Sequence, residues 1–214
     1  MLDLEQALAA LGTMEQRRID VGEVNGRIFL HKVVIGFVPG VAAKREQLRG
    51  RKDLRAKVGF LRYFLRRLAQ SRRIAVEIAP RDGVARVERV KAVAVANNAY
   101  DEGFGRVFSR QRLDGGKLSL YVLKQLTLVD VFRLTAKLLV GRWRNDPALQ
   151  IESVEAVTIR AKQPMVVAMI DGEIEMLSTP LRFTIRPLAL SVLAPAPVDD
   201  PALAADQPEF VAGA

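Results

Sequence analysis

The chain has 214 residues, of which 50% are hydrophobic and 27% are charged. This length and composition suffice for a buried core in one or two domains. The chain has no cysteine and a single histidine, His31, which excludes a disulfide framework, a thiolate metal site and the usual histidine-based zinc clusters. The formal net charge of +9 favours polyanionic partners, namely nucleic acid, an anionic membrane surface or a phosphate-bearing ligand.

The N-terminal residues show no basic stretch followed by an apolar run, so we expect no signal peptide. No uninterrupted apolar stretch reaches the ~18–20 residues that a membrane-spanning helix needs. We therefore expect a cytoplasmic protein.

The first forty residues predict a short helix followed by a β-hairpin. Leucines at spacings of four and three indicate a helix over 4–11. Residues 18–24 form an alternating strand, and Asn25-Gly26, a dipeptide that favours a tight hairpin turn, joins it to a second strand. That second strand is expected to run from residue 27 to residue 36 and to lie in the interior of a sheet, because it is apolar on both faces near its end.

Residues 44–73 carry twelve Lys or Arg residues and only two acidic ones. Apolar residues at positions 54, 58, 61, 65 and 68 predict an amphipathic helix with a narrow apolar stripe. Its basic face is either simply solvated or attracted to an anionic membrane, where each basic residue contributes ~1 kcal/mol. The two interpretations are compatible.

The middle of the chain predicts three strands and a second amphipathic helix. A strand over 73–79 turns at Asp82-Gly83 into a returning strand over 84–96, and a further strand covers 118–123. The second helix is expected over 126–141. Thr127 can cap it, Asp130 lies in its first turn and Gly141 ends it. The expected buried stripe of this helix is Val131, Leu134, Leu138 and either Val129 or Leu128.

The last third predicts strands over 151–161, 164–170, 173–177, 181–186 and 188–193. The fold class is therefore α+β and β-rich, an antiparallel β-sandwich of about nine or ten strands with two amphipathic helices. One domain over 1–194 is expected, followed by a disordered tail over 195–214 that is rich in Pro, Ala and Asp.

The turn Asp171-Gly172-Glu173 lies between two alternating apolar runs. Asp-Gly between strands indicates a tight hairpin, since Gly accepts the positive φ that such a turn needs. The turn is either a plain solvated hairpin or a pair of carboxylates in which one accepts a proton.

Five short motifs occur in an order and spacing that resemble the diacylglycerol kinase-like lipid kinases, including the bacterial soluble diacylglycerol kinases and their sphingosine kinase-like relatives. The resemblance covers residues 3 to about 194. The motifs are Asp20-Val21-Gly22-x-Val24-Asn25-Gly26-Arg27-x-Phe29, Ile35-Gly36-Phe37, Val95-Ala96-Asn97-Asn98-x-Tyr100, Arg112-Leu113-Asp114-x-Gly116-x-Leu118 and Asp171-Gly172-Glu173.

The resemblance implies a kinase that transfers the γ-phosphate of ATP to a lipid hydroxyl, on diacylglycerol or a related lipid. In that family a first domain carries a Gly-Gly-Asp-Gly-Thr loop that binds ATP, and this loop does not occur in the sequence. The resemblance therefore implies a C-terminal domain whose nucleotide-binding domain is absent, and which is inactive alone. The chain would be a natural truncation or a fragment.

The resemblance also implies site residues. Asp171 would be the base that accepts the lipid hydroxyl proton, and Glu173 would belong to the magnesium and phosphate network. A structural Mg²⁺ would be held at Arg112, Gly115 and Lys117, through the carbonyls of Arg112 and Lys117 and a carboxylate at position 115. Since Gly115 has no carboxylate, we expect Mg²⁺ to bind there weakly or not at all. His31 is expected in the core without a functional role.

The expected partners are the lipid alcohol and an anionic membrane, which would place the protein at the inner membrane face. The sequence leaves open whether the protein forms a homodimer. The alternative is a non-catalytic basic module that binds lipid or membrane. Nucleic acid is not an expected partner, because no nucleic-acid-binding motif accompanies the positive charge.

Overall fold

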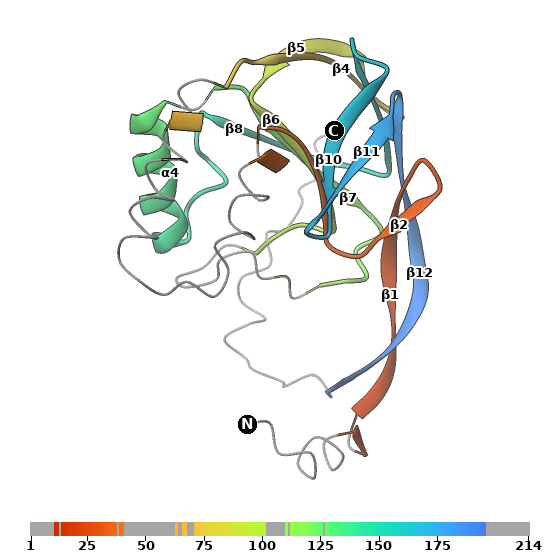
Figure 1. The fold of residues 1–214 in the computed structure, drawn as a ribbon. Coiled ribbons are helices and arrows are strands. Elements are labelled where there is room, and N and C mark those ends of the chain that lie inside the picture. The colour runs from red at the N-terminus through yellow and green to blue at the C-terminus, as the bar shows by residue number, and fades with distance from the viewer. Residues whose placement is uncertain are drawn as a thin grey trace, which may run out of the picture. The chain divides into compact units, whose positions relative to one another are not determined.

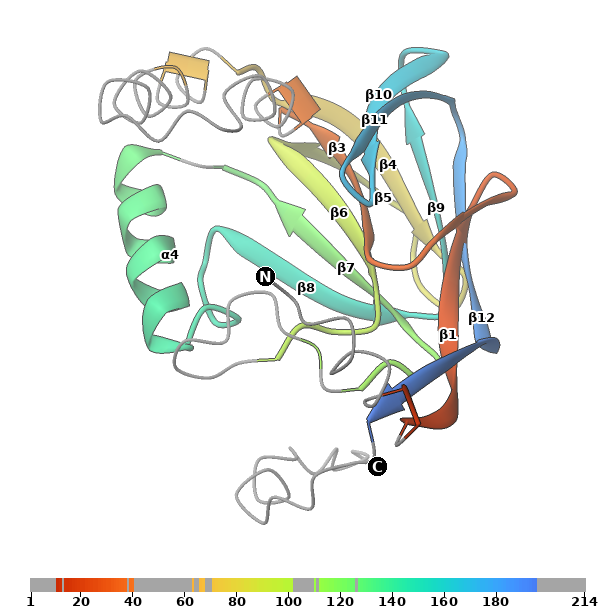
Figure 2. The same ribbon diagram turned by 60° about the horizontal axis from the view of Figure 1, so that its bottom comes forward.

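A computed structural model of the chain describes residues 11–12, 14–37, 39–40, 63, 66–67, 71–101, 110, 112–125 and 127–195. They form a β-rich sandwich of two six-stranded antiparallel sheets (Figures 1 and 2). Sheet A has the order β2 (Arg27–Phe29), β1 (Met14–Val24), β12 (Leu181–Pro195), β9 (Ala156–Ala161), β4 (Ile74–Pro80), β5 (Arg86–Val90). Sheet B has the order β11 (Glu173–Ser178), β10 (Met165–Ile170), β3 (Lys32–Gly36), β6 (Ala92–Asn97), β7 (Leu118–Leu123), β8 (Leu149–Val154).

Contacts divide the chain into two compact units, one of residues 1–18 with 191–214 and one of residues 19–190. The second unit contains most of both sheets and all of the candidate site described below. The described residues contain no helix long and apolar enough to cross a membrane.

The main core lies between the two sheets, where apolar side chains alternate with residues of the opposite face. In β7, for example, Leu118, Leu120 and Val122 belong to this core, whereas Tyr121 belongs to a second apolar cluster. Phe29 and Phe183 meet in the core edge to face, with ring centroids 6.3 Å apart.

The helix α4 (Leu128–Val140) packs against sheet B over this second cluster (Figure 2). Thr127 and Asp130 form a reciprocal capping box at its start, and Gly141 ends it in the left-handed conformation. Leu134 and Leu138 pack against a cluster made of Ala96, Tyr100, Tyr121 and Trp143.

The predicted sandwich is confirmed, but the predicted count of about nine or ten strands is wrong, because the described residues alone form twelve. Three expected strands are each divided in two: 27–36 at Leu30 and His31 into β2 and β3, 84–96 at Lys91 into β5 and β6, and 151–161 at Glu155 into β8 and β9. At all three points the chain passes from one sheet to the other. The two strands expected over 181–193 are one strand, β12, with Leu188 at φ 49°.

The two hairpin turns and the second helix are confirmed. Asn25-Gly26 and Asp171-Gly172 have the positive φ angles that the sequence predicts. Of the two alternatives for the last member of the buried stripe of α4, Val129 is excluded, since it is 71% exposed. The helices expected over 4–11 and 54–68 and the tail lie outside the described residues, apart from isolated positions.

Candidate active site at the Asp171 turn

The carboxylate of Asp171 points from the β10–β11 turn toward the bend that joins β2 to β3. Its Oδ2 accepts a hydrogen bond from the backbone N of Leu30 (2.7 Å), and its Oδ1 accepts from the backbone N of His31 (2.9 Å) and of Lys32 (2.8 Å). The register explains this position, because β10 pairs with β3 and the Asp171 N donates to the carbonyl of Lys32 (2.9 Å). Three of the roughly four lone-pair sites of the carboxylate are therefore occupied.

Asn97 and Arg110 hold the same bend through its carbonyl groups. Arg110 Nη1 donates to the carbonyls of Leu30 (3.0 Å) and Asn97 (2.7 Å). The Asn97 N donates to the carbonyl of His31 (3.0 Å), and Asn97 Nδ2 donates to the carbonyl of Leu30 (3.3 Å). The bend is thus fixed through both its N–H and its C=O groups, as the backbone of a rigid site requires.

His31 and Tyr100 form a polar aromatic pair at this bend. The Tyr100 hydroxyl lies 3.0 Å from His31 Nε2, and the rings are edge to face with centroids 5.6 Å apart. Burial raises the pKa of Tyr100, so its hydroxyl stays protonated and shares a hydrogen bond with Nε2. Burial lowers the pKa of His31 below its ordinary value, and the charges of Lys32 and Arg110 lower it further, while Asp171 opposes them. The imidazole is therefore neutral at pH 7.

Two cationic side chains complete the cluster around Asp171. Lys32 Nζ lies 5.5 Å from the centroid of the Tyr100 ring, and its pKa is lowered by burial and by the charge of Arg110. Lys and Arg beside an oriented carboxylate can bind a phosphate group close to a proton acceptor.

Glu173 lies on the same turn, in an exposed position. Its carboxylate makes no hydrogen bond or ion pair with any residue that the structure describes. It is available to a ligand from solvent, and an unpaired carboxylate fits a hard cation as one of its ligands.

An exposed apolar surface adjoins this turn. Met165 and Val167 of β10 are each 45% exposed, and Ile174 and Met176 of β11 are 42% and 55% exposed. Val167 faces Met176 across the hairpin, so these side chains share the outer face of the sheet. A ligand at Asp171 would have apolar surface beside it.

The residues at the predicted structural metal site do not fit Mg²⁺. Gly115 offers no carboxylate, and a Cβ at that position would lie 2.7 Å from Asn98 Oδ1. The carbonyl of Lys117 accepts a hydrogen bond from the Asn98 N (3.1 Å). The described residues contain no group of three His, Asp or Glu side chains that could hold a metal ion. Metal binding at Arg112, Gly115 and Lys117 stays a prediction without support from this geometry.

A buried carboxylate satisfies the turn before β7 instead. Asp20 is fully buried, and its Oδ2 accepts from the Gly116 N (2.6 Å) and from Asn98 Nδ2 (3.1 Å). Its Oδ1 accepts from the Leu188 N (2.9 Å). Both carboxylate oxygens are thus engaged by N–H groups, so this turn is completed by hydrogen bonds without a cation.

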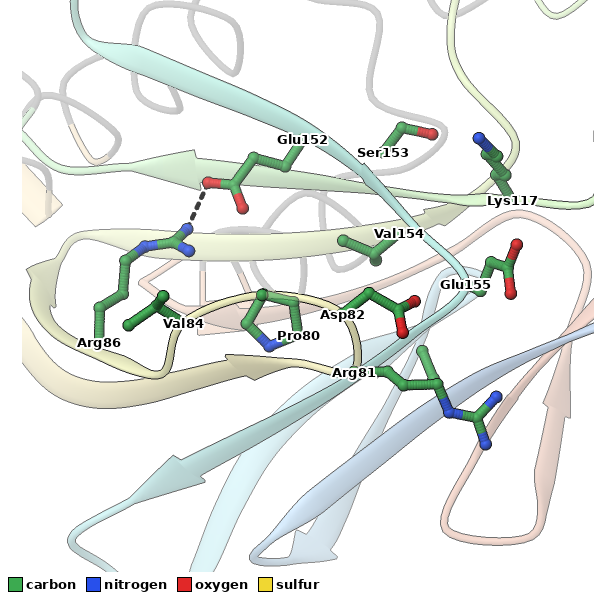
Figure 3. A pocket seen from close by; sticks show the side chains of 12 residues that line it. Pro80, Arg81, Asp82, Val84, Arg86, Lys117, Glu152, Ser153, Val154 and Glu155 are labelled. Carbon is green, nitrogen blue, oxygen red and sulfur yellow. Dashed lines mark hydrogen bonds and ion pairs between the residues drawn. The ribbon is translucent and has the colours of Figure 1, made fainter. Parts of the chain in front are cut away.

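A hollow of about 670 Å³ lies elsewhere, between the β4–β5 turn and the β8–β9 connection (Figure 3). Its lining includes Arg81, Asp82, Lys117 and Glu155, and Arg86 pairs with Glu152 across it. It shares no residue with the Asp171 cluster. Because its charges are mixed and partly paired, it favours no single class of ligand.

The structure thus brings Asp171 and Glu173 together on one turn, and places Arg112, Gly115 and Lys117 on another. Lys32 and Arg110 were not predicted from the sequence, and His31 was predicted to have no role. Asn97 and Tyr100 lie in one of the five motifs, but no role was predicted for either residue. Their place in that motif was the signal that could have pointed to the site.

Comparisons with known proteins identify the fold. The family model of the YegS C-terminal NAD kinase beta sandwich-like domain matches residues 35–194. The crystal structure of a diacylglycerol kinase from Bacillus anthracis str. Sterne is similar at 17% identity, with a TM-score of 0.52, over 83% of this chain and 53% of that one. A second structure from that strain, described provisionally as a diacylglycerol kinase, is similar at 21% identity, with a TM-score of 0.58, over 83% and 57%. The chain therefore spans about half the length of these solved structures.

The three hydrogen bonds that the Asp171 carboxylate accepts from backbone N–H groups lead to a prediction about stability. Asp171→Asn replaces one carboxylate oxygen with an N–H donor, so at least one backbone N–H loses its acceptor. We expect the free energy of unfolding to fall by about 1–2 kcal/mol. Glu173→Gln, the control on the same turn, should change it by less than about 0.5 kcal/mol. Urea titrations that gave equal losses for the two variants would contradict the role of Asp171 in the bend.

The lowered pKa of His31 leads to a prediction about pH. The unfolded chain binds a proton at His31 more readily than the folded chain, so stability should fall as the pH drops below the unfolded pKa of 6.5. The urea midpoint of the wild type should decrease more between about pH 7.5 and about pH 5.5 than that of His31→Gln, which cannot titrate. Equal decreases would rule out His31 as the source.

The geometry at Gly115 leads to a prediction about metal. The unfolding temperature should be the same in millimolar Mg²⁺ as in EDTA, because the amides and Asp20 already satisfy this turn. Calcium is the control for a non-specific ionic effect. A stabilisation that saturated with Mg²⁺ alone would show that a specific site exists.

Proposed function

The chain belongs to the family of the YegS C-terminal NAD kinase beta sandwich-like domain, and we propose that it forms the acceptor-side domain of an ATP-dependent lipid kinase. The reaction would transfer the γ-phosphate of ATP to a hydroxyl of diacylglycerol or a related lipid. One observation carries the proposal. The Asp171 carboxylate is fixed against a rigid bend that also carries Lys32 and is held by Arg110.

In the proposed reaction the lipid hydroxyl oxygen forms a bond to the γ-phosphorus while the bond to the β–γ bridging oxygen breaks and ADP leaves. The hydroxyl proton passes to the remaining lone pair of Asp171, which acts as general base. Lys32 and Arg110 stabilise negative charge on the transferred phosphoryl group. Mg²⁺ bound with ATP would neutralise further phosphate charge, and Glu173 is the proposed carboxylate of that network.

The exposed apolar surface beside the turn supports an acceptor with an apolar tail. Val167 and Met176 face each other on it. Methionine suits such a surface because its flexible side chain adapts to chains of different shape. A small polar acceptor would leave this surface in water.

The nucleotide-binding half is proposed to come from a separate domain. This is consistent with the share of the solved structures that the chain spans. We therefore propose that the chain alone transfers no phosphate.

A non-catalytic lipid- or membrane-binding module is the second candidate. The net charge of +9 and the lack of a Gly-Gly-Asp-Gly-Thr segment in the sequence favour it. It requires no catalytic carboxylate, so substitution of Asp171 distinguishes the two functions.

A kinase assay tests the proposal. The chain is fused behind the nucleotide-binding domain of a full-length family member and assayed with radiolabelled ATP and diacylglycerol in mixed micelles. We expect Asp171→Asn to lower kcat by at least about 100-fold, because loss of a general base costs about 10²–10⁴. Asp82→Asn, in the comparable exposed Asp-Gly turn between β4 and β5, is the matched control and should keep the wild-type rate.

Circular dichroism at the assay temperature confirms that each variant is folded. A wild-type rate for folded Asp171→Asn would overturn the assignment of the base. A fusion that bound lipid without any phosphate transfer would favour the binding module.

A further inference from the structure

The helix α4 is apolar on two sides. Leu134 and Leu138 face sheet B, as described above. On the outward side, Val129 is 71%, Phe132 72%, Leu139 58% and Val140 56% exposed. Together with exposed Ala136 these four residues form one stripe at spacings of three and four, which we term the outer α4 face.

The charged residues of α4 are turned away from this face. Arg133 donates to the fully buried Asp146 (2.9 Å) and to Asp130 (2.7 Å), and Lys137 pairs with the same Asp146 (3.2 Å). Asp130 is the only acidic residue of α4, and its side chain is only 16% exposed. The outer α4 face therefore carries no exposed carboxylate.

Cationic side chains lie at both ends of the helix. Lys124 precedes it and is 47% exposed although it pairs with Glu88, and exposed Arg142 follows it. An apolar stripe between cationic ends, on a chain with a net charge of +9, is complementary to a membrane with anionic headgroups. Thirteen residues of helix are too short to span a bilayer, so the helix would lie in the plane of the interface.

We propose that the outer α4 face inserts into the headgroup region of an anionic membrane and docks this domain there. Phe132, the largest and most exposed side chain of the face, is the main anchor. The reason for docking, access to a lipid acceptor, rests on the proposed function, whereas the docking itself does not.

Vesicle sedimentation of the full chain tests this proposal. The vesicles contain phosphatidylcholine with or without phosphatidylglycerol. The wild type should bind the anionic vesicles, and Phe132→Asp should weaken binding at least about tenfold, because the variant loses the apolar side chain that the membrane would bury and gains a negative charge. Val87→Asp is the matched control, since Val87 is 74% exposed on β5 and the change in charge is the same. It should bind like the wild type.

Several outcomes would overturn the proposal. Equal binding by Phe132→Asp and Val87→Asp would place the contact elsewhere, and a wild type indifferent to phosphatidylglycerol would exclude docking to an anionic membrane. A larger drop in unfolding temperature for Phe132→Asp than for Val87→Asp would show that the face is packed within the protein. Dissociation of a wild-type dimer by Phe132→Asp would assign the face to a second copy. The micelle kinase assay does not depend on docking, so failure of either proposal is recognisable separately.

Discussion

One carboxylate joins two parts of the chain that are about 140 residues apart in sequence. Asp171 accepts hydrogen bonds from the consecutive backbone N–H groups of Leu30, His31 and Lys32. Without this acceptor the bend would depend on water for its amides, and the free energy of unfolding would fall. The candidate site depends on the same contact, because it orients the carboxylate and fixes the bend that carries His31 and Lys32.

Asp20 fills a similar structural role at the entry to β7. It is fully buried and satisfies N–H groups of Asn98, Gly116 and Leu188. A turn that is completed by hydrogen bonds has no need of a cation, and Gly115 is compatible with this arrangement because a Cβ there would press on Asn98. The positions that resemble a metal site are thus occupied by a network of amides and one carboxylate.

Local features of the fold could be predicted from sequence, and non-local ones could not. Asn25-Gly26, Asp171-Gly172 and the cap at Thr127 depend on backbone conformation within a few residues, and all three are confirmed. The changes of sheet at Lys91 and Glu155 were missed, because apolar residues continue across them without a turn signal. Arg110 was missed at the site because its position depends on the tertiary fold.

The central claim is that Asp171 holds the bend at 30–32, and hydrogen exchange measured by NMR tests it most directly. In the wild type the amides of Leu30, His31 and Lys32 should be protected. In Asp171→Ala their protection should fall toward that of exposed amides, while the amides of β6 and β7 in the same sheet stay protected. Unchanged protection at all three positions would contradict the account.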